Sequence, residues 1–264
     1  VDWGDSPDRI DPTIFDIVPA SPNKVYNMHQ IIERVFDQRK DRRKNYFELF
    51  PAFATNIITC FTRLNGWTVG VIANQPMSKA GCLDINASDK ASRFIRFCDA
   101  FNIPLITLVD VPGYLPGTEQ EWGGIIRHGA KMLYAYSEAT VPKITLTFRK
   151  AYGGSYMGMC SKELGADTVF CWPSTELAVM GPEGAVPIIF KKELEEAENP
   201  EELLQQKIRE YREKFANPYL AAENIHVDDV IYPQETRPRL IKALEMVMDK
   251  VEERPEKKHG VMPT

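Results

Sequence analysis

The segment Gly153-Gly154-Ser155-Tyr156-Met157 combines two flexible glycines with a serine hydroxyl. It is the part of the chain that best suits catalysis or ligand binding. It is similar to the G-x-S-x-G nucleophile elbow, but Met157 stands where that motif needs its last glycine. The chain has no Walker sequence and no G-x-G-x-x-G, and its four histidines lack the H-E-x-x-H spacing. The sequence therefore gives no support for a nucleophilic side chain or a bound metal.

Backbone N–H groups are the donors that this stretch offers instead. An apolar strand ending near Phe148 leads through Tyr152 to Gly153 and Gly154, which open a helix. The first N–H groups of a helix have no partner within it, and the helix dipole adds partial positive charge. Glycine lets a ligand approach the backbone, so two such groups could form an oxyanion hole. The alternative is a tight turn that needs a positive φ.

Two more turns rich in glycine and proline follow apolar segments. Residues 110–118 contain Gly113 and Tyr114 and lead to the pair Gly123-Gly124 at a helix start. Residues 180–185 place a proline at the start of another helix. Loops beyond the carboxyl ends of parallel strands commonly hold ligands, so these turns are candidate contacts. The alternative is that they only connect elements.

Single side chains give weaker signals. His128 and Lys131 lie on the helix after the second glycine pair, where a structural histidine is commoner than a base. Glu119 and Glu121 would act as bases only if they were desolvated. The amide of Asn74 could contact a ligand, but a role at the edge of a hairpin is the simpler interpretation.

The elements that must hold these turns alternate along the chain. Residues 1–25 carry four prolines and are expected to form an extended arm. Asn65-Gly66 between the β-rich runs Ile57–Leu64 and Trp67–Asn74 predicts a hairpin. Strand and helix patterns then alternate around one core. We expect helices at 28–36, from Ser88, and at 123–139, 153–164, 200–215 and 236–251, and strands at 105–109, 142–148 and 168–171.

Residue spacing also predicts burial. The charged residues 37–44 are expected to form a solvated loop or helix end. The helix at 123–139 is expected to bury Trp122, Ile126, Gly129, Leu133 and Tyr136. The helix at 200–215 is expected to bury Leu204, Ile208, Tyr211 and Phe215.

The composition of the 264-residue chain, 44% hydrophobic and 26% charged, fits one globular domain. A net charge of -5 argues against nucleic-acid binding. No apolar run is long enough to span a membrane, and no signal peptide is recognisable. Five cysteines without a C-x-x-C pair indicate free thiols in a reducing compartment, and we expect the cytoplasm. The chain begins with Val1, so we expect it to be part of something larger.

Four segments are long and distinctive, and a short tail accompanies them: TLVDVPGYLPGT (107–118), GGIIRHGAK (123–131), RKAYGG (149–154), AVMGPEGA (178–185), and the tail KHG (258–260). They resemble the carboxyltransferase (β) subunit of biotin-dependent acyl-CoA carboxylases, a family that includes propionyl-CoA carboxylase and methylmalonyl-CoA decarboxylase. The resemblance extends from about Asp11 to the last residue. It matches the C-terminal half of that subunit.

The resemblance implies a crotonase-like (ClpP/crotonase) α/β fold, a spiral of ββα units with a helical C-terminus, over residues 26–264. It implies that carboxybiotin on a partner protein delivers CO2 to the α-carbon of an acyl-CoA, and that biotin itself removes the α-proton. An oxyanion hole in this half would stabilise the ureido anion of biotin. The hole of the N-terminal half would stabilise the thioester enolate.

The resemblance also implies roles for single residues. Gly154 and Ser155 would donate their N–H groups to the biotin carbonyl, and Gly153 would permit the turn. Ser155 stands where the family usually has alanine. Met157 stands where the family varies with acyl-chain preference, which leaves propionyl-CoA open as the substrate. Further expected contacts with biotin or substrate are Tyr152, Gly113, Tyr114, Gly123 and Gly124.

Other functions remain open. A decarboxylase or transcarboxylase subunit would share these motifs, whereas a non-catalytic docking and oligomerisation module would not need the intact Gly153-Gly154 turn. A crotonase-type hydratase would need paired acidic residues after the turn, and the sequence has none there. The expected partners are an acyl-CoA, a biotin carrier protein and the N-terminal carboxyltransferase half. The chemistry further predicts a homo-oligomer, either a face-to-face dimer or a hexamer.

Overall fold

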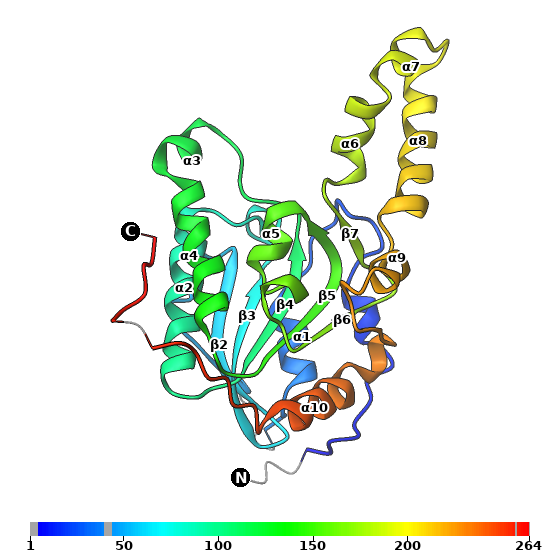
Figure 1. Ribbon diagram of the computed structural model, residues 1–264. Coiled ribbons are helices and arrows are strands. Elements are labelled where there is room, and N and C mark those ends of the chain that lie inside the picture. The colour runs from blue at the N-terminus through cyan, green and yellow to red at the C-terminus, as the bar shows by residue number, and fades with distance from the viewer. Residues whose placement is uncertain (1–4, 40–43, 257, 264) are drawn as a thin grey trace.

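A mixed β-sheet runs through the middle of the molecule (Figure 1). The computed structural model describes residues 5–39, 44–256 and 258–263. Within them the sheet has eight strands in the order β1-β2-β3-β4-β5-β6-β8, with β7 paired to β5. The strands are β1 (Tyr46–Glu48), β2 (Ile57–Leu64), β3 (Trp67–Asn74), β4 (Leu105–Val111), β5 (Lys143–Tyr152), β6 (Thr168–Cys171), β7 (Glu176–Ala178) and β8 (Asp229–Val230).

The hairpin of β2 and β3 is confirmed at the expected residues. Asn65 and Gly66 both have positive φ, 51° and 80°, as a two-residue hairpin turn requires. From β3 onward the strands pair in parallel, so their carboxyl ends meet at one edge. Every residue of β5 is buried, and this strand continues to Tyr152 rather than ending near Phe148.

Helices cover both faces of the sheet (Figure 1). On one face, α2 (Ile85–Ala100), α4 (Ile125–Glu138) and α5 (Gly153–Gly158) pack against side chains such as Leu105 and Val109. On the other, α1 (Met28–Val35) and α10 (Thr236–Val247) pack against Ile106 and Leu108. Successive residues of β4 thus point to opposite cores, which explains its unbroken apolar sequence.

Near the N-terminus, two expectations need correction. The arm is not extended throughout, because a 3-10 turn, η1 (Ile14–Ile17), buries Ile14. Asp37 was expected in a solvated patch but is buried, where it accepts the backbone N–H groups of Asn65 and Gly66 and pairs with Arg237. Residues 40–43 of that patch lie outside the described residues.

The helix expected at 123–139 is divided. Gly124, at φ 88°, ends α3 (Thr118–Gly123) and begins α4, because a left-handed residue cannot continue a helix. The expected inner stripe is wrong at its start, since Trp122 and Ile126 are 88% and 81% exposed. Similarly, α2 begins earlier than Ser88, with Asp84 accepting the Ala87 N–H as its N-cap.

The remaining helices lie mostly in the C-terminal half. In place of one helix over 153–164, α5 ends at Gly158 and a 3-10 turn, η3, follows. Helices α6, α7 and α8 form an arm that projects from the sheet (Figure 1). No helix in the described part of the chain is long and apolar enough to cross a membrane. The bounds are η2 (Lys79–Gly81), η3 (Lys162–Leu164), α6 (Pro182–Ile189), α7 (Lys191–Glu196), α8 (Pro200–Phe215), α9 (Pro218–Glu223) and η4 (Pro233–Glu235).

Candidate active site

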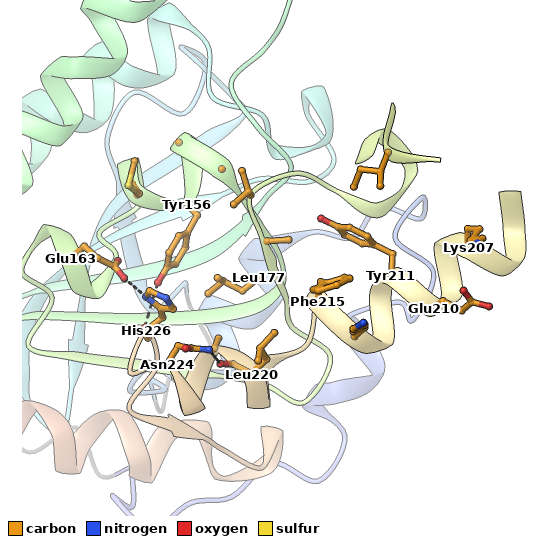
Figure 2. Close-up of a pocket in the computed structure, with 18 of the residues that line it drawn as sticks. Tyr156, Glu163, Leu177, Lys207, Glu210, Tyr211, Phe215, Leu220, Asn224 and His226 are labelled. Carbon is orange, nitrogen blue, oxygen red and sulfur yellow. Dashed lines mark hydrogen bonds and ion pairs between the residues drawn. The ribbon is translucent and has the colours of Figure 1, made fainter. Parts of the chain in front are cut away.

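A cavity of about 1050 Å³ lies where β5 ends and α5 begins (Figure 2). One wall is the turn itself with Gly153, Gly154 and Met157. Most of the lining is apolar and comes from β7, the α6–α8 arm and α9. Among these residues are Leu177, Val179, Ile189, Phe190, Tyr211, Phe215, Leu220 and Ala221.

The backbone at the turn is possible only because its first residue is glycine. Gly153 has φ 58°, and a Cβ atom there would lie 2.9 Å from the carbonyl oxygen of Val179. Such a contact is closer than carbon and oxygen tolerate, and positive φ is itself unfavourable for other residues. Gly154 has room, since the nearest atom to a Cβ there would be Tyr114 Cε2 at 4.0 Å.

The N–H groups of Gly154 and Ser155 donate to no acceptor in the described part of the chain. They belong to the first turn of α5, whose N-cap residue Tyr152 provides no side-chain cap. The Ser155 hydroxyl is buried and donates to the Tyr152 carbonyl at 2.7 Å, so it faces the chain rather than the cavity. Gly154 lines the cavity, whereas Ser155 is 1% exposed and is not among the lining residues, so one of these two adjacent donors lies at the cavity wall and the other lies behind it.

Tyr114 lies beneath α5 instead of lining the cavity. A Cβ at Gly129 would lie 2.9 Å from the Tyr114 ring, and a Cβ at Gly158 would lie 2.7 Å from the hydroxyl oxygen of Tyr114. Its hydroxyl has no partner in the described chain, and burial raises its pKa to about 12. The loop that carries it is fixed to Leu83, whose N–H donates to the carbonyl of Gly113 at 3.1 Å. Tyr114 thus supports the turn through packing.

The structure separates the other candidates from the cavity. Gly113, Gly123 and Gly124 are not among its lining residues. His128 and Lys131 both pair with Asp89 on α2, at 2.9 Å and 3.0 Å. Glu119 and Glu121 are exposed on α3. No group of three or more His, Cys, Asp or Glu side chains among the described residues could hold a metal ion.

A buried ion pair fixes the sheet side of the site. Arg149 Nη2 lies 3.0 Å from Asp110 Oδ2, and the N–H of Lys150 donates to Asp110 Oδ1 at 3.1 Å. Asn74 accepts the N–H of Asp110, so its amide is engaged within the protein. Arg149 Nη1 also donates to three carbonyls of the N-terminal arm, those of Pro19, Ser21 and Lys24.

Sequence reasoning missed the residues that complete the cavity. Tyr211 and Phe215 were expected in a buried stripe of α8, but they line the cavity, and only Ile208 of that stripe is buried. Glu163 and His226 form an ion pair at another part of the lining (Figure 2). Burial opposes ionisation of Glu163, but its hydrogen bonds, including one to His226, lower its pKa. The available signal in the sequence was the aromatic pair Tyr211 and Phe215 in the α8 stripe, which could have indicated a cavity wall.

Comparison with known proteins identifies a family and several similar sequences. The family described as carboxyl transferase domain matches residues 2–262. The chain is 58% identical over 263 residues, all of its length and 49% of the relative's, to the methylmalonyl-CoA decarboxylase subunit alpha of Veillonella parvula. It is 54% identical over 259 residues to the human mitochondrial propionyl-CoA carboxylase beta chain, covering 98% of this chain and 46% of that one.

A solved structure agrees closely. It is the transcarboxylase 12S hexamer with methylmalonyl-coenzyme A and methylmalonic acid bound, with a TM-score of 0.90 and 55% identity over 97% of this chain and 48% of that one. The crotonase-like α/β fold expected from the sequence is confirmed. The chain spans about half the length of the curated relatives it matches.

Proposed function

The chain belongs to the carboxyl transferase domain family, and from this premise we propose that it forms the biotin half-site of an acyl-CoA carboxyltransferase. The reaction would move a carboxyl group between carboxybiotin and the α-carbon of an acyl-CoA. The observation that supports this most is that Gly154, whose N–H group has no acceptor in the described part of the chain, lines an apolar cavity of about 1050 Å³, with the unbonded N–H group of Ser155 next to it in the same turn.

The residues present suit biotin. Biotin, carried on a partner protein, supplies a ureido group that can hold the transferable carboxyl. The N–H groups of Gly154 and Ser155 would bind the ureido oxygen and stabilise the negative charge that collects on it. Gly153 gives the turn its shape, because a side chain at this position would meet the carbonyl oxygen of Val179.

Met157 is the residue that we expect to influence the acyl chain. It is 45% exposed and lines the cavity one helical turn after Gly153. Its bulk would limit the space beside the reacting groups. By similarity to the relatives named above, we propose a short acyl-CoA such as propionyl-CoA or methylmalonyl-CoA as the substrate.

The direct test removes one N–H group. Gly154→Pro deletes the proposed donor at a position in the first helical turn, where no intrahelical bond is lost. Gly154→Ala is the matched control, because it keeps the N–H and its methyl group has room. Transfer of labelled carboxyl from methylmalonyl-CoA to free biotin would be measured with the chain joined to the N-terminal half of a related subunit. We expect a loss of about 100-fold to 1000-fold for the proline variant alone. Equal turnover in both variants would remove Gly154 from the mechanism.

The direction of the reaction and the assembly are further proposals. The chain is similar to relatives named as carboxylase, decarboxylase and transcarboxylase, so the proposal includes all three reactions. We propose a biotin carrier protein and an N-terminal carboxyltransferase half as partners, within a homo-oligomer such as a face-to-face dimer or a hexamer. The chain alone should then be inactive. Transfer catalysed by the chain alone would contradict this division of the site.

A reducing location is also proposed. All five cysteines are free in the structure, which suits a compartment such as the cytoplasm. Labelling of the native protein in cell fractions would test it.

A further inference from the structure

One side chain of α8, Arg212, joins the helical wall of the cavity to the glycine turn. Its Nε lies 2.7 Å from Glu176 Oε1, and its Nη2 donates to Glu183 Oε1 at 2.8 Å. Glu176 is the first residue of β7, and Glu183 lies in the first turn of α6. A single guanidinium therefore connects α8 to two other elements that border the cavity.

Glu176 continues this connection to the turn. The hydroxyl of Tyr152 donates to Glu176 Oε2 at 2.5 Å, so the two carboxylate oxygens hold a tyrosine and an arginine. The Tyr152 ring packs so closely on Gly181 that a Cβ there would lie 2.9 Å from it. Because Tyr152 directly precedes Gly153 and Gly154, these contacts hold its side chain in place at the start of the turn.

The side chains next to Arg212 are those that shape the cavity. Tyr211 precedes it, and Phe215 lies three residues later on the same helix. Both line the cavity, and their ring centroids are 5.2 Å apart (Figure 2). The contact of Arg212 with Glu176 thus anchors α8 between the two residues whose rings line the cavity.

The neighbouring charges and burial keep both Arg212 and Tyr152 protonated. Burial favours neutral Arg212, but the carboxylates of Glu176 and Glu183 outweigh it and raise the pKa of Arg212. Burial, together with the Glu176 charge, raises the pKa of Tyr152 well above its ordinary value. Tyr152 therefore remains a donor to an ionised Glu176, the geometry of a strong charge-assisted hydrogen bond.

We propose that Arg212 is a positioning residue of the carboxyltransferase site, holding the aromatic wall of α8 and the Gly153-Gly154 turn in register through Glu176 and Tyr152. The inference rests on the proposed function. Arg212 touches no reacting atom in this proposal. It fixes the distance between the apolar surface that would receive the biotin rings and the donors that would bind the ureido oxygen.

The test compares Arg212→Met with Arg209→Met. Arg209 is exposed on the same helix and has no ion pair or hydrogen bond among the described contacts, so it controls for loss of a charge from α8. The backbone amide resonances of Gly153 and Gly154 are recorded in the labelled chain, without ligand and during titration with free biotin. Melting temperature is measured alongside, and kcat and KM for biotin are measured in the chain joined to an N-terminal half.

We expect Arg212→Met to shift both glycine resonances and to weaken transfer between about tenfold and 100-fold, chiefly through KM for biotin. Arg209→Met should change neither. Arg212→Lys should recover part of the effect, because it keeps the charge but cannot contact both carboxylates equally. If Arg212→Met does not fold, Tyr152→Phe removes only the hydroxyl and should shift the resonances in the same way.

The outcomes separate the two proposals. Unchanged glycine resonances and an unchanged KM in Arg212→Met would overturn the positioning role while leaving the proposed function intact. If biotin fails to shift the Gly154 resonance of the unmodified chain and no transfer occurs, the proposed function fails. The ligand-free resonances still report whether Arg212 sets the turn, so the two failures are distinguishable.

Discussion

Two charged clusters hold the glycine turn, and they differ in their exposure to water. On the sheet side, the side chains of Arg149 and Asp110 are 3% and 0% exposed, and the arginine also binds carbonyls of the N-terminal arm. On the helical side, the side chains of Arg212 and Glu176 are 32% and 13% exposed. Removing one partner of a buried pair leaves the other charge without water, whereas water can reach the remaining partner of a partly exposed pair. Both pairs position the turn, but loss of one partner should cost more stability on the sheet side than on the helical side.

The largest expected difference is in stability. Arg149→Met would leave Asp110 buried without its cation, which should lower the free energy of unfolding by about 3–5 kcal/mol. Arg212→Met should lower it by less than about 1 kcal/mol, because water can reach Glu176 and Glu183. Urea denaturation of both variants measures this. Similar losses in the two variants would mean that the clusters do not differ.

The turn between the clusters should be sensitive at one glycine and tolerant at the next. Gly153→Ala introduces a residue at φ 58° and a Cβ 2.9 Å from the Val179 carbonyl oxygen. We expect it to cost about 1–3 kcal/mol. Gly154→Ala should be neutral or slightly stabilising, since alanine is the better helix former and has room. Thermal unfolding of the pair checks the contrast, and equal destabilisation would show that the turn is not held as described.

Replacing Ser155 should perturb the glycine turn less. Its hydroxyl donates to the Tyr152 carbonyl, and Ser155→Ala would remove that bond but keep the backbone N–H. We expect a loss of about 1 kcal/mol in unfolding free energy, with turnover within about threefold of the unmodified sequence when both are joined to the N-terminal half of a related subunit. A large loss of transfer with little loss of stability would instead assign the hydroxyl a chemical role.

The smallest expected effect is a loss of stability at alkaline pH. One tyrosine next to each cluster should produce it: Tyr26 beside Asp110 and Tyr152 beside Glu176. Burial and the Asp110 charge raise the pKa of Tyr26, while burial and the Glu176 charge raise that of Tyr152. Both phenols ionise near pH 10 when unfolded, so their contribution is present below pH 10 and is lost as the pH rises above it.

Replacing either tyrosine should reduce that loss. Tyr26→Phe and Tyr152→Phe should each make the fall in unfolding free energy between about pH 10 and 11 less steep, by up to about 1.4 kcal/mol per pH unit. Denaturation at several pH values measures the slope. An unchanged slope for Tyr152→Phe alone would indicate that water already reaches its hydroxyl, and that the helical cluster is looser than described.

Local signals in the sequence predicted more of the fold than of the site. Asn65-Gly66 determines its hairpin through backbone geometry alone, and the glycine pair at 153–154 was found for the same reason. Long-range contacts could not be predicted in this way. Asp37 is buried because it caps a turn 28 residues away, and Arg212 meets Glu176 only after the α6–α8 arm folds back.

Exposure was the hardest property to predict. Trp122 and Ile126 have the spacing of a core stripe, but Gly124 breaks the helix between them and rotates both outward. Tyr211 and Phe215 have the same kind of spacing, yet they face a cavity rather than a core. Apolar periodicity shows which face of a helix avoids water but does not show what covers that face.

The most direct measurement replaces an N–H group by an oxygen without changing any side chain. An α-hydroxy acid at position 154 or 155, in the chain joined to the N-terminal half of a related subunit, converts the amide to an ester. We predict that each ester lowers kcat for carboxyl transfer by about 100-fold to 1000-fold, with little change in melting temperature. Full activity of both esters would contradict the claim that these two backbone donors stabilise the negative oxygen.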